Sequence, residues 1–246
     1  MICSEWEVGM INTRSSGLID SLNEHTFHIL GCGAIGSSAA TQLCRMGAED
    51  FVLYDMDKVE TANIGVSQYN NNHIGEYKTV ALTELLKAIN ENVDVVQSTG
   101  YFDTFLYADR NDIIILGFDN MKSRLQVVST CLKNKHFKPR LLIDGRMGAE
   151  HYQQYSFEYP KYDKYVKTWY SDDEGSSEPC NMKATSYCSN MSGSFIANTV
   201  RKVLKNQPFE AALSFNFPTT LLDINTLYKY FKCCIIIGWF KYDEDR

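Results

Sequence analysis

The chain has 246 residues and a formal net charge of −6, with 44% hydrophobic and 22% charged residues. This composition is typical of a folded protein with one large or two small domains, and it excludes a disordered chain. A chain with this net negative charge lacks the excess of basic residues expected of a protein that binds duplex nucleic acid, so no nucleic-acid partner is expected.

Residues 1–17 contain no apolar core of signal-peptide length. The longest apolar run, residues 233–240, is shorter than the roughly 20 residues that a membrane-spanning helix needs. We therefore expect neither a targeting segment nor a membrane partner. The eight cysteines include no CxxC pair, so a four-cysteine zinc site is not expected. Without a signal peptide, they indicate reduced thiols in the cytoplasm.

The first regular elements predict a βαβ unit that follows a polar arm of residues 1–26. Residues 28–30 form a short apolar strand, and a glycine-rich turn leads into a helix that stops at Gly47. Residues 51–54 form a second strand that ends on Asp55.

The alternation of helices and strands continues as far as Asp144. Helical spacing covers residues 78–89 and 124–132, and strands are predicted near Val93–Val95 and at residues 112–116 and 141–143. Residues 112–116 (DIIIL) suit a strand that is buried on both faces. This order predicts a mostly parallel sheet with right-handed crossovers.

The pattern changes after Asp144. Residues 151–159 predict an antiparallel edge strand, 161–179 a long surface loop, 192–204 a helix, and 213–217 and 221–224 closing strands. The predicted fold class is therefore α/β, with a Rossmann-like, mostly parallel sheet of βαβ units that antiparallel strands extend. We expect an arm at 1–26, a nucleotide-binding domain at 27–225 and a C-terminal tail at 226–246.

A G-x-G-x-x-G turn follows the first strand, with glycines at 31, 33 and 36. Glycines let the chain turn tightly and let phosphates approach the amide groups at the start of a helix. Asp55 lies 19 residues after Gly36, at the end of the next strand, where a carboxylate can accept both ribose hydroxyls. These features predict a nucleotide site, but a nicotinamide-dependent oxidoreductase would share them.

Further charges follow at the ends of other strands. Asp57 comes two residues after Asp55, Lys78 begins a helix in a Gly-x-x-Lys turn, and Asp119 follows the DIIIL strand. Strand ends in parallel sheets meet at one crevice, so Asp55, Lys78 and Asp119 can share a site with a triphosphate and Mg²⁺. Any one of these residues alone would be an ordinary solvated charge.

Together these motifs resemble the ThiF/MoeB/HesA adenylyltransferases, bacterial relatives of the ubiquitin-activating enzymes. The resemblance extends from residue 27 to about residue 205 and is much more specific than the glycine motif alone. It is carried by Gly31-x-Gly33-x-x-Gly36, Asp55-x-Asp57, Val59, Asn63, Gly75-x-x-Lys78, Asp119–Asn120 and Arg124.

The resemblance implies that ATP is bound and that a protein C-terminal carboxylate attacks its α-phosphate, giving an acyl-adenylate and pyrophosphate. It places Asp55 on the ribose, Lys78 on the phosphates, Asn63 at the phosphate end and Asp119 on Mg²⁺. The partner would be a ubiquitin-like or sulfur-carrier protein ending in Gly-Gly, and the enzyme would be a homodimer. The implied nucleotide contacts are Gly31, Gly33, Ala34, Ile35, Gly36, Asp55, Asp57, Asn63, Gln68, Lys78, Asp119 and Asn120.

The chain departs from the family pattern after Asn63. The family has an Arg-Gln pair whose Arg contacts the triphosphate, whereas residues 64–68 here contain a Gln, Gln68, but no Arg. Arg14, from the arm of a neighbouring subunit, is a candidate replacement, and otherwise it is a solvated surface residue. Arg146 is a second basic candidate near a strand end. Because the family's Arg is missing, a second alternative stays open, in which the chain is a degenerate member of the family that binds a nucleotide or partner without turnover.

Some relatives transfer the activated acyl group to a loop cysteine, and Cys180 is the candidate here. A nearby positive group would have to lower its pKa, and Lys183 favours this while Glu178 opposes it. The alternative is an ordinary thiol. The zinc cysteines of many relatives are missing. The remaining candidates are predicted to pack in the interior: Cys32, Cys44, Cys131 and Cys188.

Overall fold

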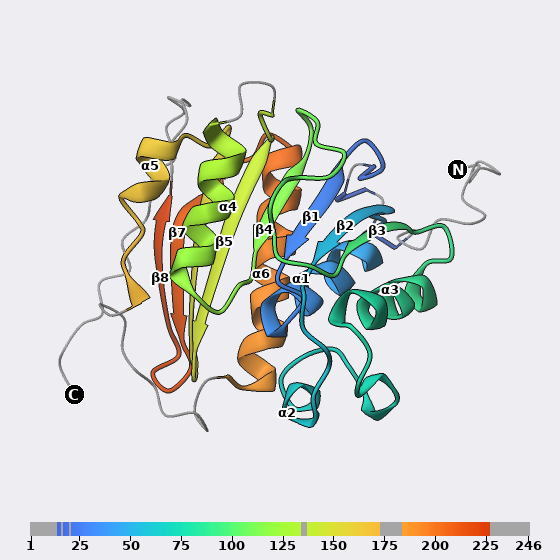
Figure 1. Cartoon of the computed structure of the whole chain (residues 1–246). Helices are drawn as coiled ribbons and strands as arrows, with labels where there is room; N and C mark the ends of the chain where they lie inside the picture. The colour runs from blue at the N-terminus through green and yellow to red at the C-terminus, as the bar shows by residue number, and fades with distance from the viewer. Residues whose placement is uncertain (1–13, 16, 20, 134–136, 173–183, 227–246) are drawn as a thin grey trace, which may run out of the picture.

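A computed structural model (Figure 1) describes residues 14–15, 17–19, 21–133, 137–172 and 184–226. Within these residues, eight strands form one sheet in the order β3-β2-β1-β4-β5-β6-β7-β8. Strands β1 to β5 are parallel, and β6, β7 and β8 are added antiparallel. The strands are β1 (Thr26–Leu30), β2 (Asp50–Tyr54), β3 (Asp94–Ser98), β4 (Ile113–Leu116), β5 (Leu141–Gly148), β6 (His151–Glu158), β7 (Glu210–Asn216) and β8 (Leu221–Thr226). The predicted Rossmann-like sheet with an antiparallel extension is confirmed.

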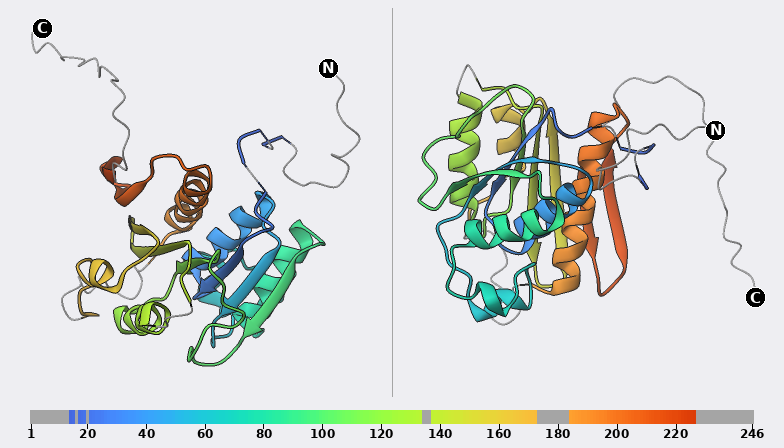
Figure 2. Two further views of the ribbon diagram at one scale, coloured as in Figure 1. Left: turned by 90° about the horizontal axis from the view of Figure 1, so that it is seen from above. Right: turned by 90° about the vertical axis from the view of Figure 1, so that its right-hand side faces the viewer.

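Helices cover both faces of the sheet (Figure 2). On one face lie α1 (Ala34–Arg45), α3 (Lys78–Ile89) and α6 (Ser186–Leu204). On the other lie α4 (Met121–Lys133) and α5 (Tyr162–Val166). The short helices α2 (Thr61–Ile64) and η2 (Asn71–His73) belong to the connection between β2 and α3. Among the helices of the described residues, none is both long and apolar enough to cross a bilayer.

The central strands are buried on both faces. In β1, Phe27 and Ile29 contribute to the apolar cluster under α1, α3 and α6, whereas Leu30 contributes to the cluster under α4 and α5. In β4, Ile115 contributes to the first of these clusters and Ile114 to the second. Two buried faces explain why β4 is apolar at every position, and why the one polar side chain in the buried part of β1, His28, is itself buried.

Four predictions for the second half of the chain need correction. The strand at 151–159 is antiparallel but not an edge, because β6 pairs with β5 on one side and with β7 on the other. Part of the predicted loop at 161–179 is helix α5, which is held by the buried ring of Tyr165. Strand β5 extends to Gly148, well beyond residue 143, and α6 begins at Ser186 instead of Ser192.

Candidate functional site

The glycine turn holds the ends of three strands together. Gly31 has a φ of +89°, and a Cβ there would lie 2.8 Å from the backbone of Gly117, which follows β4. A Cβ on Gly36 would overlap the carbonyl oxygen of Gly31. The Gly31 N–H donates to Tyr54 O at 2.8 Å, and the Gly117 N–H donates to Leu30 O at 2.7 Å. The turn therefore requires glycine and brings the carboxyl ends of β1, β2 and β4 to one place.

The start of α1 is shaped to receive an anion. Gly33 is the N-cap and supplies no side-chain hydrogen bond to the helix, and a Cβ there would meet open space. The N–H groups of a helix's first turn have no partners within the helix, and they carry the positive end of its dipole. Ile35 has a buried side chain, so it can offer a ligand only its backbone. The geometry suits a phosphate at this point.

Asp55 ties the glycine turn to the end of β2. Its Oδ2 accepts the Cys32 N–H at 2.7 Å, and its Oδ1 accepts the Asp57 N–H at 2.9 Å. Burial raises the pKa of Asp55, while the nearby Lys78 and these two N–H groups favour the charged form. Each oxygen keeps a further lone pair, so an ionised Asp55 can still accept hydrogen bonds from two hydroxyls.

Lys78 lies beside Asp55 and Asp57 at the start of α3. Its Nζ is 2.9 Å from Asp57 Oδ2, and its side chain is mostly buried while that of Asp57 is exposed. Burial disfavours the ammonium, but Asp55 and Asp57 outweigh burial and raise the pKa of Lys78. Tyr69 was not predicted, yet its hydroxyl donates to Cys32 O and lies 3.2 Å from Lys78 O. It thus links the glycine turn to the start of α3.

Asp119 follows β4 at the same edge of the sheet, and its side chain is exposed. In the described residues its one hydrogen bond comes from Asn120 Nδ2 at 3.1 Å, and neither a hydrogen bond nor an ion pair joins it to Asp55 or Lys78. Asn120 also caps α4, because its Oδ1 accepts the Ser123 N–H at 2.7 Å. No cluster of three or more acidic, His or Cys ligands occurs in the described part of the chain. A single free carboxylate still fits Mg²⁺, which commonly takes one or two carboxylates together with substrate phosphates.

Two predicted contact residues have local partners. Asn63 Oδ1 accepts the Glu60 N–H at 2.9 Å, which caps α2. Gln68 Nε2 donates to Asn190 Oδ1 of α6 at 2.7 Å. Both side chains help to shape the connection between β2 and α3, and contact with a nucleotide stays a prediction for them.

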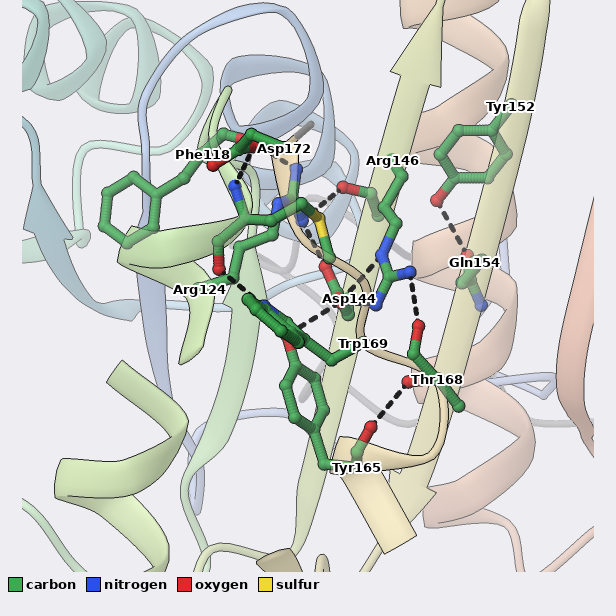
Figure 3. Close-up of polar contacts among 12 residues, drawn as sticks. Phe118, Arg124, Asp144, Arg146, Tyr152, Gln154, Tyr165, Thr168, Trp169 and Asp172 are labelled. Atoms are coloured by element: carbon green, nitrogen blue, oxygen red, sulfur yellow. Dashed lines mark hydrogen bonds and ion pairs between the residues drawn. The ribbon is translucent and has the colours of Figure 1, made fainter. Parts of the chain in front are cut away.

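The candidates for the missing cation and for the acyl acceptor have different outcomes. Arg14 is exposed in a turn of the arm, and its role stays a prediction. Arg146 is not at a free strand end but inside β5, where it is buried in an ion pair with Asp144 (Figure 3). Cys180 lies outside the described residues. Cys188 is buried in α6 as predicted, and burial raises its pKa to about 11.

The other cysteines of the described region are also interior. Cys32, Cys44 and Cys131 are buried, as predicted. Burial raises the pKa of Cys32 well above its usual value and that of Cys44 to about 11. Because the thiolate is the nucleophile, these three thiols are poor candidates for an acyl acceptor.

The buried charge cluster around Asp144 was not predicted from the sequence. The carboxylate of Asp144 is fully buried and pairs with both Arg124 and Arg146 (Figure 3). Tyr165 also donates to it, at 3.0 Å. The sequence offered only the acid at the end of the predicted strand and three arginines within 20 residues of it, Arg124, Arg140 and Arg146, of which the first and last pair with it.

Comparison with known proteins identifies the family of the chain. The model of the ThiF family matches residues 10–232. Ubiquitin-like modifier-activating enzyme 5 of Caenorhabditis elegans is 29% identical over 126 residues, covering 46% of this chain and 30% of the relative. The protein of the same name from Oryza sativa subsp. japonica is 30% identical over 134 residues, covering 47% and 32%. The matched region is thus less than a third of either relative.

Solved structures share the fold at low sequence identity. E. coli MccB, in a crystal structure with ATP, has a TM-score of 0.67 and 16% identity, covering 88% of this chain and 68% of that chain. PaaA has a TM-score of 0.65 and 16% identity, covering 85% and 66%. At this identity the likeness concerns the fold alone. Since the family model covers most of the sequence and the fold agrees with it, the chain belongs to the ThiF family.

Proposed function

We propose that this chain catalyses the ATP-dependent adenylation of a carboxylate at the C-terminus of a protein or peptide. The pairing of Asp55 with the glycine turn and of Lys78 with Asp57 carries the proposal, because it sets a ribose acceptor and a phosphate cation beside an uncapped helix start. Membership of the ThiF family favours adenylation over the nicotinamide-dependent alternative. Relatives named ubiquitin-like modifier-activating enzyme 5, and crystal structures of MccB with ATP and with MccA, point to the same class of reaction.

The proposed reaction forms one bond and breaks another at the α-phosphorus. A carboxylate oxygen of the partner attacks, the bond to the bridging oxygen breaks, and pyrophosphate leaves with its electron pair. Asp55 orients the ribose, the first turn of α1 and Lys78 neutralise phosphate charge, and Asp119 supplies a ligand for Mg²⁺. The ion would neutralise the leaving pyrophosphate. Positioning and charge neutralisation therefore do the catalytic work, without a protein acid or base.

The partner is proposed to be a ubiquitin-like or sulfur-carrier protein that ends in Gly-Gly. The test is ATP–pyrophosphate exchange with such proteins, with their C-terminally amidated forms as matched controls. We expect exchange that requires the free carboxylate and is lost in Asp55→Asn. No binding of magnesium-ATP at millimolar nucleotide would contradict the proposal. Binding without exchange would support a member that lacks turnover, which the missing Arg near residue 64 motivates. Selective thermal stabilisation by NAD over ATP would instead indicate the oxidoreductase.

A homodimer in which Arg14 reaches the neighbouring site is also part of the proposal. If Arg14 acts in trans, mixing inactive Arg14→Ala and Lys78→Met proteins gives heterodimers with one intact site. Exchange activity should then return in the mixture. Failure to recover activity in proven heterodimers would exclude the role in trans.

Transfer of the acyl group to Cys180 is the last part of the proposal. The thiolate would attack the acyl carbon of the adenylate, and AMP would leave with its electron pair. Reduced thiols and a cytoplasmic location are proposed with it. We expect a covalent adduct with the partner that a reducing thiol cleaves and that Cys180→Ala abolishes. The matched control is Cys188→Ala, which removes a thiol buried in α6 and should keep the adduct. An adduct that survives in Cys180→Ala would contradict the assignment.

A further inference from the structure

The buried carboxylate of Asp144 joins two arginines that come from different elements (Figure 3). It pairs with Arg124 of α4, and its Oδ2 accepts from Arg146 Nε at 3.0 Å and Nη2 at 2.7 Å. Tyr165 of α5 donates to the same Oδ2 at 3.0 Å. Asp144 and both arginines are buried. Charge-assisted bonds of this kind are strong and directional, so the cluster fixes the relative positions of α4, α5 and β5.

Arg124 carries this constraint to the loop that bears Asp119. Its guanidinium donates to Asp144 and to Gly145 O, at 2.8 Å, on one side, and to Phe118 O on the other. Phe118 immediately precedes Asp119 in the chain. The planar fork of one side chain thus joins β5 to the backbone next to the candidate metal ligand.

The segment after α5 holds the other end of the same loop. Arg146 Nη1 donates to Thr168 O at 2.7 Å, which anchors this segment to the cluster. Trp169 Nε1 donates to Met121 O at 2.8 Å, and Asp172 Oδ1 accepts the Met121 N–H at 2.7 Å. Residues 118 and 121 are both held, and the exposed side chain of Asp119 lies between them.

We propose that Asp144, acting through Arg124, is a positioning residue that fixes the loop presenting Asp119 to Mg²⁺. This inference rests on the proposed function, because it concerns how the Asp144 cluster positions a residue of the same nucleotide site. A free carboxylate on a fixed backbone binds a metal without first losing the entropy of a mobile loop. Residues that orient a metal ligand from behind are expected to affect metal affinity more than nucleotide affinity.

The test compares Arg124→Lys with Arg140→Lys in the whole chain. Arg124→Lys keeps the positive charge beside Asp144 but removes the planar guanidinium, which alone can donate to both Asp144 and Phe118 O. Arg140 lies just before β5 and pairs with Glu158 at 3.0 Å. Since β4 and β5 are parallel, Arg140 lies at the opposite ends of these strands from Asp119, and Arg140→Lys is a matched arginine-to-lysine change away from the loop. We expect Arg124→Lys to raise the Mg²⁺ concentration for half-maximal exchange by about tenfold, while affinity for metal-free ATP is unchanged.

A second measurement does not depend on activity or on bound metal. Hydrogen exchange of the Met121 amide should be faster in Arg124→Lys than in wild type and unchanged in Arg140→Lys. Trp169→Phe removes the bond to Met121 O but keeps an aromatic ring against the apolar cluster, and it should give a smaller shift in Mg²⁺ dependence. This variant keeps the proposal testable if Arg124→Lys does not fold.

The outcomes separate this proposal from the proposed function. If wild type fails to bind magnesium-ATP, the proposed function fails, and the hydrogen exchange result still decides whether Arg124 holds the loop. If wild type is active and both arginine variants show the same Mg²⁺ dependence, the positioning role is overturned. Equal losses in metal-free and metal-bound ATP affinity would also overturn it, because they would indicate general destabilisation of the site.

Discussion

Two groups of charged residues, one around Asp55 and one around Asp144, differ in what satisfies their charges. Around Asp55, the partners are backbone N–H groups and a lysine whose own partner, Asp57, is exposed. Around Asp144, two buried arginines and a tyrosine complete the carboxylate's hydrogen bonds. The first group keeps hydrogen-bonding capacity for a ligand, whereas the second uses its capacity internally. We call Asp55, Asp57 and Lys78 the open group, which suits ligand binding. We call Asp144, Arg124, Arg146 and Tyr165 the closed group, which suits stabilising the fold.

The largest expected effect is on stability, in the closed group. Asp144→Asn should lower the free energy of unfolding by about 3–5 kcal/mol, because it leaves two buried arginines without their counter-charge. Asp57→Asn is the matched change in the open group and should cost less than about 1 kcal/mol, since its carboxylate is exposed. Urea unfolding measures both. Equal losses would remove the distinction between the two groups.

Substitutions at two glycines of the same motif should distinguish a role in packing from a role in admitting the phosphates of a ligand. Gly36→Ala should destabilise the fold by about 2 kcal/mol or more, because the new methyl group overlaps Gly31 O. Gly33→Ala meets open space and should change stability by less than about 1 kcal/mol, yet weaken ATP binding where phosphates approach. Urea unfolding and isothermal titration with ATP check the pair. Normal ATP affinity in a folded Gly33→Ala protein would argue against phosphate at this turn.

Lys78→Met should affect binding more than stability, as expected for the open group. Loss of a charged hydrogen bond to phosphate should weaken magnesium-ATP binding by about ten- to a hundredfold. Lys87→Met removes an exposed lysine from the last turn of the same helix and should bind normally. Calorimetry measures both affinities. Similar affinities for the two variants would show that Lys78 does not contribute to nucleotide binding.

The smallest expected effect is a pH dependence of nucleotide binding at Asp55. Because burial raises the pKa of Asp55, nucleotide affinity should begin to fall on acidification at a higher pH than an exposed aspartate would give. A raised folded pKa means that the Asp55 contribution to stability is present at low pH and is lost as the pH rises through that pKa. Unfolding driven by Asp55 therefore does not explain the loss of affinity. Titrating ATP across pH in wild type and Asp55→Asn checks this, and the difference between the two proteins isolates the Asp55 contribution from the titration of ATP itself.

The sequence by itself determined the parallel half of the sheet and most of the open group. Helix α3 has the bounds that the spacing of its apolar residues predicts, Lys78 to Ile89. The glycine turn and Asp55 also lie as predicted, at adjacent strand ends. These features depend on residues close in the chain and on a periodicity that local backbone geometry imposes, so the order of residues contains them.

Only the tertiary structure decided the closed group and the position of β6. The Met121 N–H meets Asp172 Oδ1 across 51 residues, and nothing near Met121 in the sequence specifies that partner. His28, predicted as part of an apolar strand, is buried 2.9 Å from Asp112, a pairing over 84 residues. Charged residues look alike in sequence whether they are solvated or buried, because burial depends on which distant segments pack over them. Long-range packing therefore separated the charges left for a ligand from those that hold the fold.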